Sequence, residues 1–210
     1  MHGMRRYAAL VVVLLILAAP LLQGGALHGD WRWDLTQAAG YASLALFAAT
    51  LVVPGVGVLQ PRHRRLGETA AMLLAAHVLC ALVLEPWSLY YLSWESPAYM
   101  LAGIAAVGCV AALLLTSYRP VRLRSHGSYS AFTIWHRTLA VGTALLTLWH
   151  VLGSRLFLSP STASLVVLAM AIALLPTIGR SRWPTGRRVL AVTLLALAVI
   201  PAFLLLGYRS

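Results

Sequence analysis

Seven long runs of apolar residues constrain the fold of this chain more than any other feature of its sequence. They lie at roughly 7–23, 36–58, 66–85, 97–117, 132–152, 163–179 and 188–207. A helix needs about 20 apolar residues to cross the hydrocarbon core of a bilayer. Charged residues make up 10% of the chain, which is too few to cover a soluble globule. Because the runs are apolar on every side and do not alternate like barrel strands, they predict an all-α, polytopic membrane helix bundle.

The net charge of +11 is distributed as a topology signal rather than as a nucleic-acid-binding surface. The basic clusters are Arg5 and Arg6; Arg62, Arg64 and Arg65; Arg119, Arg122 and Arg124; and Arg180, Arg182, Arg187 and Arg188. They fall on alternate connections and therefore on one side of the membrane, which the positive-inside rule identifies as the cytoplasm. We expect a multi-pass protein of the inner (plasma) membrane with a cytoplasmic N-terminus and no nucleic-acid partner. Residues 1–26 also resemble a cleaved signal peptide, but a retained first helix is favoured.

Local signals locate the ends of two of the expected helices. Pro61 suits the first turn of a helix, so the third helix is predicted to run from near Pro61 to Glu85. Ser128 or Ser130 can cap a fifth helix that extends to about Gly153.

Those two helices carry histidines at matching positions. The stretches HRRLGETAAMLLAAH and HRTLAVGTALLTLWH begin and end with His63 and His77, and with His136 and His150. Each pair is 14 residues apart, or almost four helical turns, so its members share one helix face about 21 Å apart along the axis. Both helices leave the cytoplasm and run parallel. His63 is therefore predicted to lie level with His136, and His77 with His150.

Two imidazoles that face each other between helices can supply both axial positions of a haem iron, and two such levels make two haems. An ionisable side chain in the membrane is expensive and usually functional. Small residues that could flank a macrocycle are Gly67, Ala75, Ala76, Gly142 and Ala144. The alternative for each histidine is an interfacial or anchoring role, and this applies most to His63 among its arginines. The histidines without a partner at the right depth, expected to be solvated or interfacial, are His2, His28 and His126.

With these histidines the chain resembles the ferric reductase-like transmembrane domain superfamily. The superfamily includes ferric reductases, NADPH oxidases and the haem-binding membrane subunit of the periplasmic methionine sulfoxide reductase system. The Arg-x-Leu-Gly context at Arg64 to Gly67 is also similar. The resemblance covers roughly 36–180 as a six-helix haem-binding core. The span at 188–207 would be a seventh helix within a single transmembrane domain of residues 1–210.

The resemblance implies transmembrane electron transfer by a b-type cytochrome, an electron-transfer subunit of an oxidoreductase. Two haems are expected, and one haem remains an alternative. Electrons would come from a cytoplasmic flavin reductase or from quinol and pass to a periplasmic or extracellular acceptor. Arg64, Arg65 and Arg137 could pair with the propionates of the inner haem or serve as cytoplasmic anchors.

Two other functions fit the sequence. One is a cofactor-free membrane transporter or scaffold subunit, although the internal repeat typical of transporters is not evident. The other is a haem-bearing assembly subunit or quinol oxidoreductase of an unrelated type. Bound haem distinguishes the cytochrome from the first alternative, and the electron donor distinguishes it from the second.

Overall fold

The computed structural model describes residues 2–22, 30–53, 60–93, 95–118, 121, 124, 126–154 and 160–179. In this part of the chain it defines six long α-helices and one short 3-10 helix: α1 (His2–Leu22), α2 (Trp31–Val52), α3 (Gln60–Leu84), η2 (Pro86–Leu92), α4 (Ala98–Ser117), α6 (Tyr129–Ser154) and α7 (Pro160–Gly179). The expected all-α bundle is confirmed. The expected span at 188–207 lies outside the described residues.

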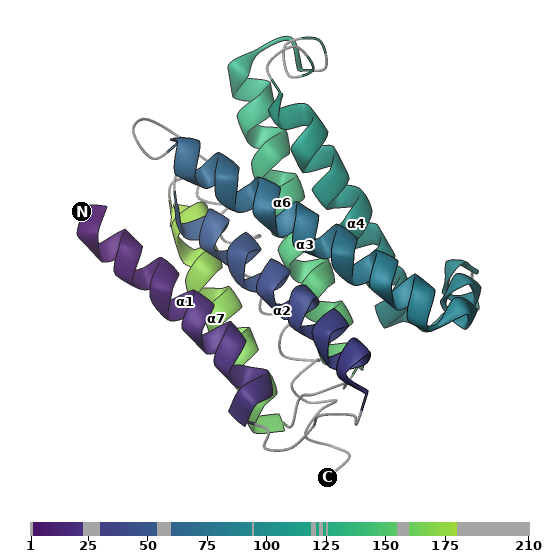
Figure 1. Cartoon of the computed structure of the whole chain (residues 1–210). Coiled ribbons are helices and arrows are strands. Elements are labelled where there is room, and N and C mark those ends of the chain that lie inside the picture. Colours follow the sequence, from purple (N-terminus) through teal and green to yellow (C-terminus); the bar gives the residue numbers. More distant parts are fainter. Residues whose placement is uncertain are drawn as a thin grey trace.

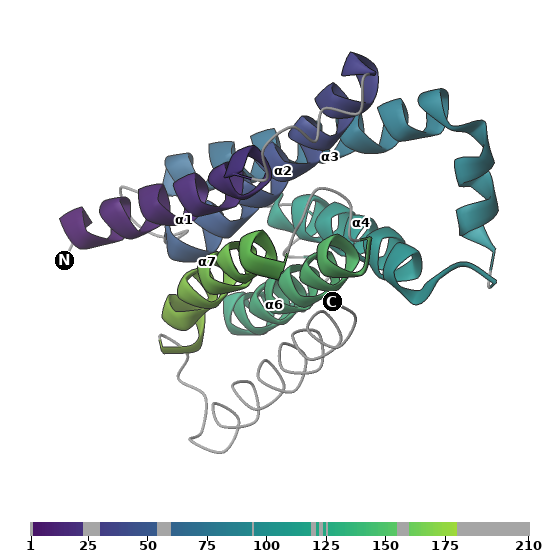
Figure 2. The same cartoon turned by 90° about the horizontal axis from the view of Figure 1, so that it is seen from below.

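The long helices run side by side in a bundle (Figure 1). Seen from below, α1, α2 and α3 form one layer and α7, α6 and α4 form the other (Figure 2). Neighbouring helices in each layer are in contact, and α1 and α2 both pack on α7 across the layers. The closest packing is between α2 and α3 and between α4 and α6. These two pairs are antiparallel hairpins, because the start of one helix lies beside the end of the next.

Helix ends follow from local hydrogen bonds. The Asp30 carboxylate accepts the backbone N–H of Arg32 at 2.9 Å and caps α2, and Asp34 adds a negative charge in the first turn, where the helix dipole favours it. The Ser128 hydroxyl accepts the backbone N–H of Ala131 at 3.1 Å. Ser128 therefore caps α6, and it is one of the two serines, Ser128 and Ser130, that the sequence offered as the cap.

The buried core lies where α1, α2, α6 and α7 meet. Its most deeply buried large side chains are Val12, Ile16, Val52, Val166, Met170 and Leu174. By contrast, α3 has one buried residue, Ala70, among its 25. Most of the α3 surface is therefore left for lipid or for a group held inside the bundle.

Three of the described helices, α2, α3 and α4, are each long and apolar enough to cross a membrane. Shorter apolar stretches lie in α1 at Tyr7–Ala19 and in α7 at Thr162–Leu175. The observed bounds agree with the predicted segments to within a few residues, except that α1, α2, α3, α6 and α7 begin earlier and α2 ends earlier than the apolar runs. Polar N-terminal turns account for much of this difference, because capping and charged residues join a helix without adding to its apolar length.

Candidate functional site

His63 and His136 face each other at one end of the bundle. Their ring centroids lie 6.3 Å apart, with an angle of 55° between the ring planes. The Nδ1 of His63 lies 2.9 Å from the backbone carbonyl oxygen of Val53, at the end of α2. The ring of His136 packs on Phe132 with centroids 5.2 Å apart. The His136 Nδ1 is buried and has no hydrogen-bond partner among the described residues.

The second predicted level, His77 and His150, lies toward the other end of α3 and α6, 14 residues beyond His63 and His136 on each helix. The Nδ1 of His77 lies 2.8 Å from the carbonyl oxygen of Thr36 on α2. The Nδ1 of His150 lies 3.0 Å from the carbonyl oxygen of Tyr99 on α4. Each of these histidines therefore hydrogen-bonds to the helix that packs as the antiparallel partner of the helix that carries it.

The helices that carry the histidines are held apart. Within the described residues no Cα atom of α3 lies within 8 Å of a Cα atom of α6. Between them is a small hollow of about 50 Å³. Its lining comes from α2, α3, α4 and α6: Gly40, Ser43, Leu44, Phe47, Gly67, Ala70, Leu74, Val110, Thr143 and Thr147. The hollow lies along the helices between the two histidine levels.

The carbonyl bonds determine which ring nitrogen carries the proton. A carbonyl oxygen only accepts, so the Nδ1 of His63, His77 and His150 must donate. In the neutral ring the lone pair is then on Nε2, which is the state of a metal-binding imidazole. The part of the chain that the structure describes contains no cluster of three or more His, Cys, Asp or Glu side chains able to hold a metal ion. Paired imidazoles suit a metal whose other positions are filled by a macrocycle.

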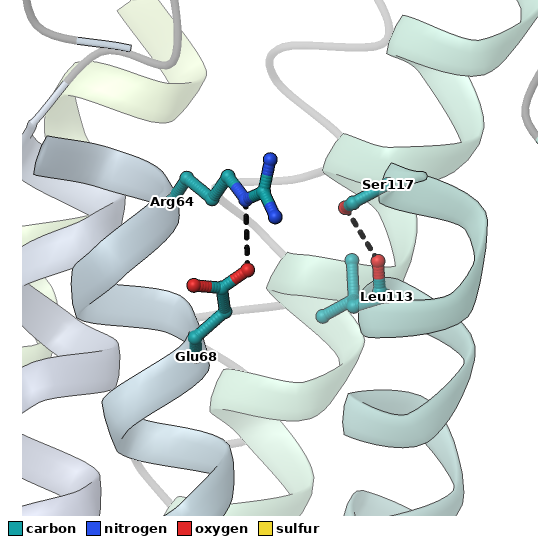
Figure 3. A network of polar contacts seen from close by, with 4 residues as sticks. All are labelled: Arg64, Glu68, Leu113 and Ser117. Carbon is teal, nitrogen blue, oxygen red and sulfur yellow. Dashed lines mark hydrogen bonds and ion pairs between the residues drawn. The ribbon is translucent and has the colours of Figure 1, made fainter. Parts of the chain in front are cut away.

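The three arginines of the predicted site lie at the His63 end and differ in their surroundings. Arg64 donates from Nε to the Glu68 carboxylate at 2.7 Å and points between α3 and α4 (Figure 3). Its guanidinium carbon also lies 5.6 Å from the centre of the Tyr118 ring. Arg65 is exposed and Arg137 is half-buried. Arg64 thus already has a carboxylate partner within its own helix.

The small residues expected beside a macrocycle lie in different environments in the structure. Gly67 lines the hollow, and a side chain at Gly142 would meet nothing within 4 Å. Ala144 is instead fully buried in the core, while Ala75 and Ala76 are exposed. His126, expected to be solvated or interfacial, has a buried Nε2 atom without a partner among the described residues, and its ring packs on Phe132.

Two functional candidates were missed from the sequence. Gly40 on α2 lies against the ring of His77, and Gly103 on α4 lies against the ring of His150. The carbonyl that His77 approaches belongs to Thr36, four residues before Gly40. The carbonyl that His150 approaches belongs to Tyr99, four residues before Gly103. A glycine inside an apolar span is a weak signal, because it has many packing explanations, and it becomes informative once its neighbour across the hairpin is known.

These features define a multi-pass helical membrane protein with one facing pair of histidines, His63 and His136, and two further histidines at matching positions on the same helices. A family model for the ferric reductase like transmembrane component matches residues 8–147. The chain therefore belongs to this family of membrane redox proteins, as the sequence resemblance indicated. The match begins near the start of α1, earlier than the resemblance at roughly 36–180. Comparisons with individual curated proteins and with solved structures gave no significant match.

Proposed function

We propose that this protein is a b-type cytochrome with two haems, which carries electrons from a cytoplasmic flavin or quinol donor to an acceptor outside the membrane. The proposal is supported by the facing of His63 and His136 across the gap between α3 and α6, and by the matching positions of His77 and His150 further along the same two helices. His63 and His136 would hold one haem iron, and His77 and His150 the other.

The ring separation at the first level supports this assignment. A metal–imidazole bond of about 2.0 Å, with a little over 1 Å from nitrogen to ring centre, sets two trans imidazoles about 6 Å apart between centroids. The rings of His63 and His136 lie 6.3 Å apart. Tilted ring contacts also occur at this separation, so the count of bound haem is what tests the assignment.

The chain contributes orientation and room. The carbonyls of Val53, Thr36 and Tyr99 hold three of the four imidazoles with Nε2 free to ligate. Gly40, Gly67 and Ala70 contribute small residues to the lining of the hollow between the levels. A bis-histidine haem supplies one-electron transfer without an open position for oxygen. We therefore place substrate chemistry outside the haem ligand sphere, on an acceptor or a partner protein.

The proposed direction of transfer follows from the distribution of charge. The arginine clusters support a position of the His63 level near the cytoplasm, in an inner (plasma) membrane protein with a cytoplasmic N-terminus. Arg65 and Arg137 would then be available to the propionates of the inner haem. The His77 level would face a periplasmic or extracellular acceptor.

The test is a dithionite-reduced minus oxidised optical spectrum of the purified protein, with haem per chain counted by pyridine haemochrome. Two b-type haems per chain are expected. His77→Ala and His150→Ala should each remove the same haem, and His63→Ala and His136→Ala the other. His126→Ala serves as the control and should retain both, because His126 has no histidine at the 14-residue spacing that defines the two predicted levels.

The outcomes separate the alternatives. A single haem that survives His63→Ala would contradict the inner site and leave His63 as a basic anchor. Absence of haem in protein from haem-replete cells would overturn the proposal and leave a cofactor-free transporter or scaffold. Reduction by quinol, but not by a flavin reductase, would identify the donor.

A further inference from the structure

A glycine lies against the outer edge of each histidine of the second level. A Cβ atom added to Gly40 would lie 2.9 Å from Nδ1 of His77 and 3.1 Å from its Cε1. A Cβ atom added to Gly103 would lie 2.6 Å from Nδ1 of His150. Contacts this short between carbon and a ring nitrogen require the ring or the helix to move. The two hairpins thus have the same arrangement, although their sequences differ.

Helix geometry explains the spacing of four residues between carbonyl and glycine. In an α-helix the carbonyl of residue i points along the axis toward the N–H of residue i+4. A side chain that approaches this carbonyl from a neighbouring helix must pass the Cβ of residue i+4. Gly40 stands four residues after Thr36, and Gly103 four residues after Tyr99. The missing side chain gives each histidine access to a carbonyl that is already bonded within its own helix.

We propose that Gly40 and Gly103 are positioning residues, which open the Thr36 and Tyr99 carbonyls to the Nδ1–H of His77 and His150 and so prepare both Nε2 atoms to bind haem iron. The inference deepens the proposed cytochrome function and rests on it for the haem. The two hydrogen bonds themselves are features of the chain and can be measured without haem.

The glycines should influence the haem through ligand basicity. An Nδ1–H bonded to a carbonyl makes the imidazole a stronger donor, which favours ferric over ferrous iron and lowers the midpoint potential. A methyl group at Gly103 would push the His150 ring away from the Tyr99 carbonyl. The affected haem should then have a higher midpoint potential and an altered low-spin electron paramagnetic resonance signal.

Gly108 provides a matched control on the same helix as Gly103, since an added Cβ would meet nothing within 4 Å. Gly103→Ala should raise the midpoint potential of the haem that His77→Ala removes, or lower its occupancy. Gly108→Ala should leave the potential and occupancy of both haems as in the wild type, although it gives the helix the same gain in propensity. Equal potentials, signals and occupancies in the two variants would overturn the proposal. Gly40→Ala should reproduce the effect of Gly103→Ala at the same haem.

A second measurement does not depend on a variant folding or on haem. Nitrogen-15 spectra of labelled, haem-free wild-type protein report the tautomer of each histidine. His77 and His150 should carry the proton on Nδ1, and Nε2–H tautomers at both would overturn the proposal. If the wild type binds no haem but shows the Nδ1–H tautomers, the cytochrome function fails while the two hydrogen bonds of His77 and His150 stand.

Discussion

The imidazoles of His63 and His136 face each other with ring centroids 6.3 Å apart, yet they differ in their hydrogen bonds. The His63 Nδ1 donates to the carbonyl of Val53, whereas the His136 Nδ1 is buried without a partner among the described residues. At the other level, both His77 and His150 donate to carbonyls. The two levels are therefore chemically unequal.

This inequality predicts the order of the two midpoint potentials in the proposed cytochrome. The haem of His77 and His150, with both ligands bonded through Nδ1, should have the lower potential. Positive charge near the other haem, from Arg65 and Arg137, would favour its ferrous form and act in the same direction. Potentiometric titration of His77→Ala and of His63→Ala isolates one haem each. The haem left in His77→Ala should have the higher potential, and the reverse order would contradict the prediction.

The hydroxyl of Ser43 joins α2 to α3 and should contribute to stability. It donates to the Ala70 carbonyl at 2.8 Å in a buried position. Ser43→Ala should lower the free energy of unfolding by about 1 kcal/mol, a typical value for one such bond between membrane helices. The control is Ser117→Ala, whose hydroxyl donates at 2.6 Å to Leu113 within its own helix (Figure 3). Denaturation followed by circular dichroism in mixed detergent should show a smaller loss for Ser117→Ala. Equal losses would count against a role for Ser43 in holding the two helices together.

Met170 tests the packing of the core on α7, because its side chain is 1% exposed. Met170→Ala should cost about 2 kcal/mol of unfolding free energy, at the low end for such truncations in cores. Lipid is as apolar as the core, so the lost contacts and the cavity dominate this cost. Met72 on α3 is 66% exposed, and Met72→Ala should change stability by less than about 0.5 kcal/mol. A similar cost for both variants would indicate that the buried packing of Met170 is not what stabilises the bundle.

Tyr90, in the η2 segment between α3 and α4, provides a prediction about pH. Its hydroxyl donates to the Glu95 carboxylate at 2.8 Å, and this hydrogen bond raises the pKa of Tyr90 above its ordinary value. The bond is present while the phenol is neutral, below pH about 10, and is lost as the pH rises through the raised pKa. An ultraviolet difference titration of wild type against Tyr90→Phe should give a midpoint above about 10. Glu95→Gln should lower that midpoint, and a midpoint insensitive to this change would exclude the carboxylate as the cause.

Much of the fold was predictable because each part of the signal is local. Apolar length determines which segments can cross a bilayer, and α2, α3 and α4 meet that condition. The N-cap Ser128 could also be predicted from the sequence, because capping depends on residues that are neighbours in the chain. The level of each histidine on its helix follows from a spacing of 14 residues and the helical period.

The partners of those histidines depend on the tertiary structure. No sequence pattern shows that the Thr36 carbonyl lies beside His77, because that contact depends on how α2 and α3 are offset along their axes. The roles of Gly40 and Gly103 are hidden for the same reason, since a missing side chain has meaning only beside the ring that occupies its place.

The sequence by itself therefore determined the helical membrane class and the heights of the candidate ligands, through apolar length and helical periodicity. The tertiary structure decided which carbonyl His63, His77 and His150 each bind. It also decided that the His136 Nδ1 has no partner among the described residues, and that α3 is separated from α6. These properties depend on distances between helices, and a distance between helices is set by the side chains packed between them rather than by either helix alone.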